Sequence, residues 1–325
     1  MQEIPITALA PLRIGQAEDA AAGTGCTVLL CEQGMAAGAD VRGGGPASRE
    51  TQLLNPLMAA KAIHAVVLAG GSAFGLAAAN GVMELLEQRG FGFDVGVTKV
   101  PLVVQSDLFD LTVGDPFTRP DAAMGRAAAL AALDAPNYRD GNFGAGCGAT
   151  VGKIAGMETC MKTGMGSDAV QLGELKIGAV VALNALGDVY DWRTGRQIAG
   201  LRTADGRGLR STSAYMAEHA EPVENRFAGN TTLGAVITNA AFDKARLCKL
   251  AGMAQDGYAR SIRPVHTGMD GDSIYALSVG DVSADLDFVG ALAAEVMSEA
   301  IIRSVRSAEG AYGYPAAADL GIQFT

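Results

Sequence analysis

Six apolar side chains recur at helical spacing near the C-terminal end of this 325-residue chain. They are Val289, Leu292, Val296, Met297, Ile301 and Val305. Spacings of three and four residues place all six on one face of a helix, where they form a continuous apolar stripe. Such a stripe is stable only when another layer of secondary structure covers it. The chain must therefore supply that layer, and the rest of the sequence indicates β-sheets.

Short apolar runs bounded by glycine or polar residues indicate the strands. The runs at 27–31 and 36–41 predict one hairpin through Glu32-Gln33-Gly34. A second hairpin is predicted from 174–183 and 187–192. Further strands are expected at 64–68, about 99–104, 231–240 and 273–279, and further helices at 73–88, about 120–133 and 243–262.

Two connections carry specific expectations. Ser72 follows Gly70-Gly71 and is expected to cap the N-terminus of the helix 73–88. Residues 201–229 show neither helical nor strand periodicity, so they predict a loop or surface arm.

Paired strands mixed with long amphipathic helices indicate an α+β fold, in which helices cover sheets. The 43 glycines are about twice the usual share of roughly 7%, so much of the backbone must turn sharply or pack closely. A four-layer α/β/β/α sandwich is compatible with this pattern, but periodicity alone does not choose it over other α+β arrangements. Without a repeat or a second compositional regime, residues 1–325 are expected to form a single domain.

Composition limits the binding partners and the cellular compartment that are expected for the chain. A net charge of −10, without a Lys/Arg cluster, argues against nucleic-acid and anionic-membrane partners. No stretch approaches eighteen uninterrupted apolar residues, and the N-terminus lacks the pattern of a secretory signal. Five cysteines without Cys-x-x-Cys or Cys/His pairing indicate neither a disulfide framework nor a zinc site. These features favour buried thiols in a reducing cytoplasm.

The segment Gly229-Asn230-Thr231-Thr232-Leu233-Gly234 opens an apolar, strand-like run. A hydroxyl that follows asparagine at the start of a buried strand can cut the preceding peptide bond and become an N-terminal nucleophile. An N-terminal threonine carries its own base, because an α-amino group has an unperturbed pKa of about 7.7 to 8.0. Alone, however, the dipeptide fits an ordinary start of a strand, and Asn230-Thr231-Thr232 also matches the N-glycosylation pattern.

The glycine-rich residues 144–153 suggest nucleotide binding, but they fail its tests. Cys147 stands where a P-loop needs glycine, and Ile154 follows Lys153 where Ser or Thr would bind magnesium. Val151 stands at the third glycine of a dinucleotide-binding Gly-x-Gly-x-x-Gly. No nucleotide cofactor is therefore expected. Lys153 is either an ordinary loop lysine or a cation that reaches buried chemistry.

Asp270 and Asp272 flank Gly271 just before a predicted strand. Side chains two residues apart in extended chain face the same side, so these carboxylates could converge on one site. They could equally cap a turn, which is the usual role of Asp-Gly. The longer alternation of EF-hand ligands is missing, so no metal site is predicted.

Three sequence blocks occur in order along the chain. They are Ala69-Gly70-Gly71-Ser72-Ala73-Phe74-Gly75-Leu76, then Gly229-Asn230-Thr231-Thr232, then Pro264-Val265-His266-Thr267 followed by Asp270-Gly271-Asp272. They resemble the strand-to-helix signature, the autoprocessing site and the second catalytic segment of the L-aminopeptidase/D-Ala-esterase/amidase family. That family includes β-aminopeptidases and nylon-oligomer hydrolases, and the resemblance covers most of the chain.

The resemblance implies an architecture and a processing event. The architecture is a four-layer α/β/β/α sandwich, distantly related to ornithine acetyltransferases. The event is self-cleavage between Asn230 and Thr231, which would give an α-chain of residues 1–230 and a β-chain of residues 231–325. Homo-oligomers of cleaved protomers are expected.

The same resemblance implies five catalytic residues. Thr231 is the nucleophile. Asn184 matches an asparagine that helps to hold the oxyanion, and Lys153 matches a lysine that supplies positive charge nearby. Asp270 and Asp272 match an acidic pair, which would orient the amine and hydroxyl of Thr231.

Two residues are expected on the substrate side. Phe109 stands where several members have tyrosine, so a phenolic hydroxyl is absent, which could cost up to a few kcal/mol if nothing replaces it. Asp107 stands where aminopeptidase members can place a carboxylate for the substrate amine, an arrangement that favours free amino termini. A solvated loop aspartate is the alternative for Asp107.

The sequence thus predicts a self-processing amide hydrolase, an aminopeptidase or amidase. It would form an acyl-enzyme on Thr231 and act on a small peptide or amino-acyl amide without a cofactor. An acyltransferase of the ornithine-acetyltransferase type would use the same nucleophile and differ only in what resolves the acyl-enzyme. A binding protein of the same fold with weakened catalysis is a third possibility, which Phe109 keeps open.

Overall fold

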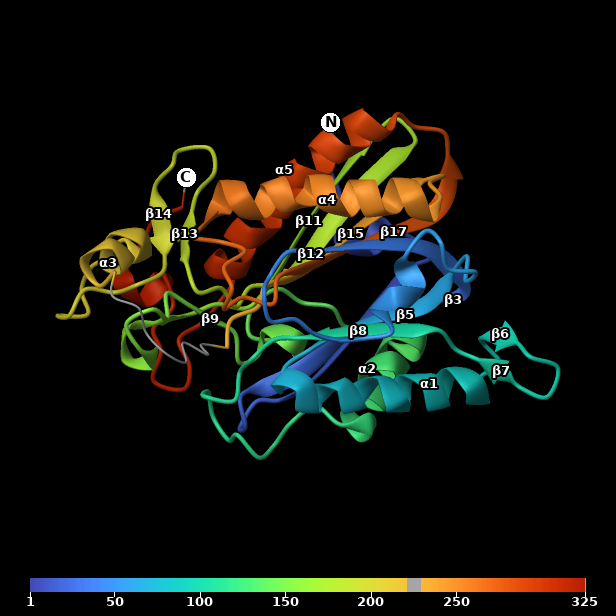
Figure 1. Ribbon diagram of the computed structural model, residues 1–325, viewed down its shortest axis with the longest axis horizontal. Coiled ribbons are helices and arrows are strands. Elements are labelled where there is room, and N and C mark those ends of the chain that lie inside the picture. The colour runs from blue at the N-terminus through green and yellow to red at the C-terminus, as the bar shows by residue number, and fades with distance from the viewer. Residues whose placement is uncertain (221–228, 325) are drawn as a thin grey trace.

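The computed structural model describes residues 1–220 and 229–324. Two stacked sheets form its centre, and helices cover both outer faces (Figure 1). Helices α4 (Lys244–Ser261) and α5 (Leu286–Arg306) cover one sheet, here called sheet I. Helices α1 (Ala78–Gln88) and α2 (Ala122–Asp134) cover the other, sheet II. The predicted four-layer α/β/β/α sandwich is confirmed.

Sheet I brings together the strands that border the predicted nucleophile. Its order is β1 (Gln2–Glu3), β11 (Met165–Leu172), β12 (Leu175–Ala182), β15 (Leu233–Ala240), β17 (Ser273–Val282) and the second half of β3 (Thr24–Val41). Only β15 and β17 run parallel within this order; Leu233 lies opposite Ser273 in β17 and opposite Ala182 in β12. The starts of β15 and β17 therefore meet the end of β12 at one edge of the sheet.

Sheet II is built around the first half of β3. Its order is β2 (Arg13–Asp19), β3, β5 (Ile63–Ala69), β8 (Val103–Asp107) and β4 (Ala47–Arg49). Strands β5 and β8 run parallel, and the other neighbours are antiparallel. Both sheets share β3, so the strands of the two layers form one continuous hydrogen-bonded path.

The predicted hairpin through Glu32-Gln33-Gly34 is wrong. Both of its runs belong to β3, whose first half pairs with β2 and β5 while residues 36–41 pair with β17. Gly34 adopts a φ of 79°, and the register shifts between Leu30 and Met35. The chain thus bends from one sheet into the other instead of reversing, because pairing with the adjacent strand β2 and with the distant strands β5 and β17 replaces the local turn.

The second predicted hairpin is also wrong in its pairing. Strand β12 pairs with β11 and β15, whereas β13 (Asp188–Tyr190) pairs with β14 (Gln197–Ala199) and β16 (Ile262–Arg263). Residues 183–187 therefore cross from sheet I to a small separate sheet. This crossing places Asn184 at the edge where β15 and β17 begin.

Two local expectations are corrected as well. Ser72 does not cap the helix through its side chain: it has a φ of 53° and opens a 3-10 turn (Ser72–Ala77), after which α1 begins. The stretch 201–229 contains helix α3 (Thr212–Glu218), which Ser211 caps. Residues 221–228 of the predicted arm lie outside the described part of the chain.

Four further short strands lie among the described residues. They are β6 (Phe93–Asp94), β7 (Lys99–Val100), β9 (Thr150–Val151) and β10 (Met161–Lys162). Figure 1 places β6 and β7 at the end of the molecule opposite β9 and β13.

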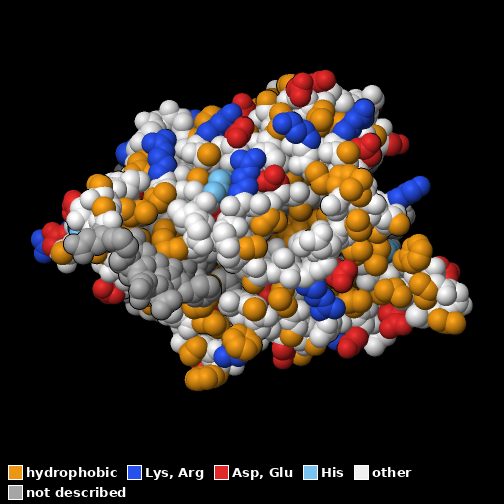
Figure 2. Space-filling model, viewed as in Figure 1, with side chains coloured by type: hydrophobic (Ala, Val, Ile, Leu, Met, Phe, Trp, Pro, Cys, Tyr) orange, Lys and Arg blue, Asp and Glu red, His pale blue; other side chains and the backbone are white. Residues whose placement is uncertain are grey.

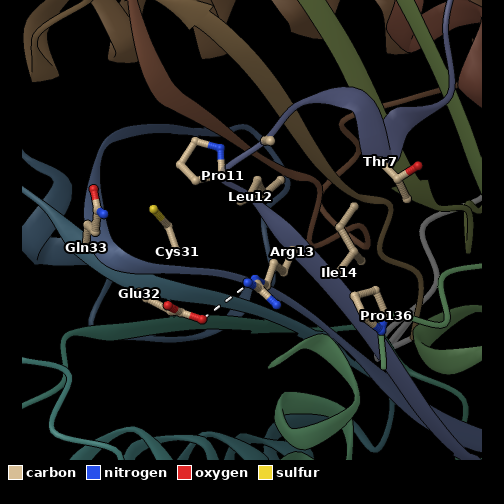
Figure 3. A pocket seen from close by; sticks show the side chains of 10 residues that line it. Thr7, Pro11, Leu12, Arg13, Ile14, Cys31, Glu32, Gln33 and Pro136 are labelled. Carbon is tan, nitrogen blue, oxygen red and sulfur yellow. Dashed lines mark ion pairs between the residues drawn. The ribbon is translucent and has the colours of Figure 1, made fainter. Parts of the chain in front are cut away.

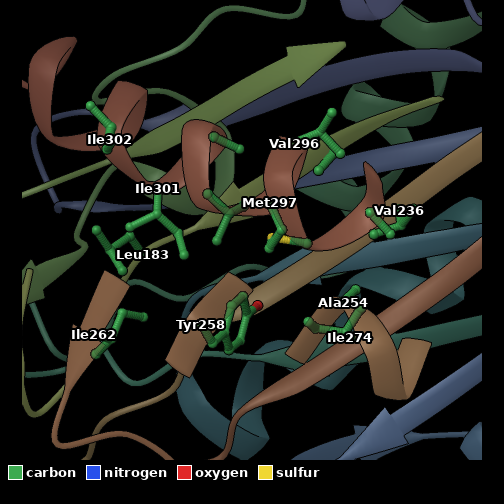
Figure 4. Packing of buried hydrophobic residues seen from close by; sticks show 14 of the residues in the cluster. Leu183, Val236, Ala254, Tyr258, Ile262, Ile274, Val296, Met297, Ile301 and Ile302 are labelled. Atoms are coloured by element: carbon green, nitrogen blue, oxygen red, sulfur yellow. The ribbon is translucent and has the colours of Figure 1, made fainter. Parts of the chain in front are cut away.

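The apolar stripe of the last helix is buried as predicted. All six of its residues are at most 6% exposed. Figure 4 shows Met297 of α5 pointing toward Tyr258 of α4; Val296 and Ile301, also of α5, and Val236 of β15 belong to the same buried cluster. Alternation along β12 turns its odd-numbered residues from 177 to 181 toward these helices, and Val180 and Ala182 toward sheet II. One strand thus supports two cores.

The surface agrees with the acidic composition. Acidic and basic side chains are interspersed on the face drawn in Figure 2, and hydrophobic ones gather around β6 and β7, where Phe93 is 62% and Val97 93% exposed. None of the helices in the described ranges is long and apolar enough to cross a bilayer. All five cysteines are free thiols, and all but the half-buried Cys248 are buried.

Candidate active site

Chain topology brings the predicted nucleophile and the predicted acidic pair to one edge of sheet I. Thr231 and Asn230 directly precede β15, and residues 270–272 directly precede β17. Since β15 and β17 run parallel and in register, the two preceding segments lie side by side. Asn230 and Asp270 form an isolated parallel β-bridge. The parallel pairing is the reason that residues about forty positions apart share one site.

The peptide bond between Asn230 and Thr231 lies in a buried, polar setting. Thr231 is 4% exposed and Asn230 is 1% exposed. The Thr231 hydroxyl donates to the carbonyl oxygen of Asn230 at 2.5 Å, and the Gly271 N–H donates to the same oxygen at 2.9 Å. The hydroxyl of the predicted nucleophile and a backbone N–H therefore both contact the carbonyl oxygen of Asn230.

Asn184 organises the back of this site. Its backbone oxygen accepts the Thr231 N–H at 2.8 Å. Its side-chain oxygen accepts from Lys153 Nζ at 2.7 Å and from the Thr150 N–H at 3.1 Å, and its Nδ2 donates to the Phe109 carbonyl at 3.0 Å. Asn184 thus joins two other segments, the glycine-rich loop and the segment of Phe109, to Thr231. Stabilisation of an oxyanion by its side chain stays a prediction.

Lys153 is a buried cation near the predicted nucleophile. Its Nζ also donates to the Asn184 backbone oxygen at 3.3 Å and to the Gly229 carbonyl at 3.4 Å. Burial lowers the pKa of Lys153 to about 8, against the opposing influence of Cys160, Asp270 and other acidic groups. A positive charge at neutral pH therefore sits within hydrogen-bonding distance of the carbonyl that accepts the Thr231 amide.

The two aspartates have different partners. Asp272 accepts the Thr232 N–H at 2.8 Å through one oxygen, and through the other it pairs with His266 Nδ1 at 3.0 Å. Asp270 accepts the N–H and hydroxyl of Thr267 at 2.9 and 2.6 Å, so it caps a turn. Burial, and then the charge of Asp272, raises the pKa of Asp270. Orientation of a free Thr231 amine by this pair stays a prediction.

Phe109 contacts the residue two positions before Thr231. A Cβ built on Gly229 would lie 1.9 Å from Cγ of Phe109. Asp107, at the end of β8, is buried, and one of its oxygens accepts from Gln105 Nε2 at 2.7 Å. Burial, and then the charge of Asp110, raises the pKa of Asp107 well above its usual value. The solvated-loop alternative for Asp107 is therefore wrong.

Sequence reasoning missed two contributions to the site. The backbone N–H of Gly271 is one, because a motif of side chains does not show where an amide points. The other is the Gly43-Gly44-Gly45 loop, whose Gly45 N–H donates to the Asp270 carbonyl at 2.9 Å. A Cβ on Gly43 would lie 2.4 Å from backbone atoms of Asp270 and Asp272, so only glycine packs there. Three consecutive glycines were a readable signal of close packing.

A second buried lysine shapes the glycine-rich loop that carries Lys153. Lys162 Nζ donates to the carbonyls of Gly146 and Ala149 at 3.0 and 3.2 Å, and also to that of Thr163. Burial lowers the pKa of Lys162 to about 7. Its contacts order the chain just before Thr150, which donates to Asn184.

Two cavities in the described part of the chain lie apart from these residues. A cavity of about 440 Å³ lies beside the Arg13–Glu32 ion pair and Cys31, and its lining includes none of the predicted site residues (Figure 3). Another, of about 660 Å³, lies beside Arg303 and Asp168. Within residues 1–220 and 229–324, no group of three or more His, Cys, Asp and Glu side chains is arranged to hold a metal ion.

Comparisons with known sequences match almost the whole chain. The model of Peptidase family S58 matches residues 5–317. An uncharacterised aminopeptidase of Mycobacterium leprae (strain TN) is 38% identical over 314 residues, which cover 90% of this chain and 84% of the relative. A 6-aminohexanoate-oligomer endohydrolase of Agromyces sp. (strain KY5R) is 31% identical over 309 residues, which cover 90% and 83%.

Solved structures share the fold. The L-aminopeptidase D-Ala-esterase/amidase of Ochrobactrum anthropi, described as a variant of the Ntn hydrolase fold, has a TM-score of 0.72 and 17% identity, with 97% of this chain and 91% of that chain covered. The β-aminopeptidase of a Burkholderia species has a TM-score of 0.66 and 18% identity, with 100% and 97% covered. The resemblance drawn from three sequence blocks is confirmed: the chain belongs to peptidase family S58 and is a hydrolase of the aminopeptidase and amidase type.

Proposed function

We propose that this chain cleaves itself between Asn230 and Thr231 and then hydrolyses amides with Thr231 as an N-terminal nucleophile. The observation that carries the proposal is the contact of the Thr231 hydroxyl with the Asn230 carbonyl at 2.5 Å, together with the Gly271 N–H on that carbonyl. Family membership supports the amide chemistry. The site geometry supports the choice of nucleophile.

Self-cleavage begins when Thr231 Oγ attacks the carbonyl carbon of Asn230 and a five-membered ring forms. Negative charge develops on the carbonyl oxygen, which the Gly271 N–H stabilises. The C–N bond then breaks, and the leaving nitrogen takes the proton that the hydroxyl has lost. The product is an ester of Asn230 on Thr231. Water hydrolyses the ester to leave an Asn230 carboxylate and a free Thr231 with both amine and hydroxyl.

Turnover uses the new terminus. The free amine of Thr231 removes the proton from its own hydroxyl, which attacks a substrate amide and forms an acyl-enzyme that water resolves. The amine works as a base only when it is neutral. Lys153 donates to the same Asn184 oxygen as the Thr231 nitrogen, so its positive charge disfavours protonation of the amine.

The relatives indicate the kind of substrate. They include aminopeptidases and 6-aminohexanoate-oligomer endohydrolases, which favours a small peptide or amino-acyl amide for this chain. We further propose that cleaved protomers assemble into homo-oligomers and work in a reducing cytoplasm, in keeping with five free cysteines.

Intact-mass measurement of the purified wild type tests the proposal. Two chains are expected, and N-terminal sequencing of the smaller one should begin at Thr231. The processed protein should hydrolyse amino-acyl p-nitroanilides, and added amine acceptors should not divert most of the acyl group. A wild type that stays one chain would refute self-processing, and transfer mainly to the acceptor would make the enzyme an acyltransferase.

The charge of Lys153 should be visible in the pH dependence of turnover. Below its pKa of about 8, Lys153 is charged and holds the pKa of the Thr231 amine down. Replacing Lys153 with methionine should therefore shift the acidic limb of kcat/KM upward by about one pH unit or more. The wild-type advantage should be largest near pH 6 to 7 and shrink above pH 8, where Lys153 loses its proton. Rates are normalised to the processed fraction, and a ratio that does not change with pH would exclude this role.

A further inference from the structure

This inference rests on the proposed function and concerns the contact between Phe109 and Gly229, which limits the acyl groups that Thr231 can receive. A Cβ built on Gly229 would lie 1.9, 2.2 and 2.4 Å from Cγ and the two Cδ atoms of Phe109. Distances under 3 Å force an atom to move. The atoms concerned are the root of the ring and not the end of a flexible side chain. The contact therefore admits glycine only, unless Phe109 or Gly229 retreats.

Hydrogen bonds hold the backbone at Phe109 and the residues on either side of it. The Leu108 N–H donates to the Ala69 carbonyl at 2.8 Å, and the Phe109 carbonyl accepts from Asn184 Nδ2 at 3.0 Å. Asp110 accepts the Gly71 N–H at 2.7 Å and the Thr24 hydroxyl at 2.7 Å. Moving the ring by a backbone shift would break bonds that also position Asn184.

Gly229 is equally constrained. Its carbonyl accepts from Lys153 Nζ at 3.4 Å. The next residue bridges Asp270, and its carbonyl is held by Gly271 and by Thr231. A retreat of Gly229 from Phe109 would pull the scissile carbonyl away from the hydroxyl that attacks it.

We propose that Phe109 is a specificity-determining residue, whose ring selects acyl groups without a branch at the second unit before the scissile bond. In self-cleavage that unit is Gly229. In turnover the carbonyl of the substrate takes the place of the Asn230 carbonyl, so the unit before it takes the place of Gly229. A glycyl unit or an unbranched methylene chain fits there, and a unit that carries a Cβ does not.

Time-resolved cell-free synthesis, followed by intact mass, tests the self-cleavage part. Gly229→Ala should slow cleavage by about a hundredfold, because small displacements of reacting atoms are costly. Adding Phe109→Ala should restore most of the rate. Phe93→Ala serves as the matched control, since it removes an exposed ring at the other end of the molecule and should restore nothing. Cleavage of Gly229→Ala at the wild-type rate, or equal rescue by both ring truncations, would overturn the proposal.

Gly229→Ala and Phe109→Ala can also be combined with Thr231→Ala, which is expected not to cleave. In that background, thermal unfolding measures the contact between Phe109 and Gly229. There Gly229→Ala should lower the melting temperature by about 3 °C or more, and Phe109→Ala should remove that loss. A wild type that never cleaves would refute the proposed function. The melting temperatures of the single and double variants at Gly229 and Phe109 would still test whether the two residues are in contact. No coupling between the two substitutions in this background would overturn the contact itself.

The substrate part is read with two p-nitroanilides on the processed enzyme. Gly-Asn-p-nitroanilide should be hydrolysed at least about tenfold faster than Ala-Asn-p-nitroanilide, and Phe109→Ala should reduce that preference. Equal rates, or no turnover of either compound, would overturn the extension from self-cleavage to substrates.

Discussion

Replacing Thr231 with alanine is expected to leave the chain as a single polypeptide and to abolish amide hydrolysis. The hydroxyl that contacts the Asn230 carbonyl at 2.5 Å is the proposed nucleophile of both reactions, so both should fail together. Loss of a nucleophile typically costs several orders of magnitude, and a fall of at least about a thousandfold in kcat/KM is expected. Intact mass reports the first reaction, and p-nitroanilide hydrolysis reports the second.

Thr231→Ser is the matched control, because it keeps the hydroxyl and removes only a methyl group. It should still split into two chains and still turn over. A Thr231→Ala protein that splits at residue 230 would show that another group cuts the chain. Hydrolysis by an unsplit Thr231→Ala protein would separate turnover from the nucleophile proposed here.

Gly271→Ala is expected to slow self-cleavage by about a hundredfold while the chain still folds, because it displaces the nucleophile without removing it. The new Cβ would lie 2.5 Å from Thr231 Oγ. On its other side it meets the backbone of Gly45 and Pro46 at 3.0 and 3.2 Å, so the hydroxyl must give way. Overpacking of this kind typically costs about 1–3 kcal/mol of stability, which thermal unfolding measures alongside the cleavage rate.

Gly268→Ala supplies the control within the same loop. A Cβ there meets nothing within 4 Å, so cleavage and melting temperature should stay close to those of the wild type. Equal slowing by both substitutions would mean that the loop tolerates no alanine, and the argument from space beside Thr231 would fail.

The sequence predicted the layers better than it predicted the pairing of strands. Periodicity identified the last helix and β15, since burial of an apolar face depends on local spacing. Both proposed hairpins were wrong: residues 36–41 of β3 pair with the distant strand β17, and β12 pairs with β11, which precedes it, and with the distant strand β15 instead of with β13. Pairing is decided by which distant strands cover which buried face, and a local turn signal does not contain that information.

In the candidate site, too, the sequence could name some residues but not their contacts. Thr231 and the acidic pair could be named from the residue types that begin two predicted strands. Lys153, Asn184 and Phe109 were named only through the family resemblance, because they come from three separate connections and spacing along the chain does not show that these meet near Thr231. The motif left open whether Asp270 caps a turn or faces the site. Only the contacts with Thr267 show the capping role.

By itself, then, the sequence predicted the residue types of the candidate site: a hydroxyl after asparagine and two carboxylates around a glycine. Only the tertiary structure decided that the Gly271 N–H donates to the Asn230 carbonyl and that Phe109 packs against Gly229. The physical reason is that each residue type in the sequence specifies the functional group of its own side chain. The direction of a backbone amide and the space left for a Cβ exist only after parallel β15 and β17 have brought distant segments together.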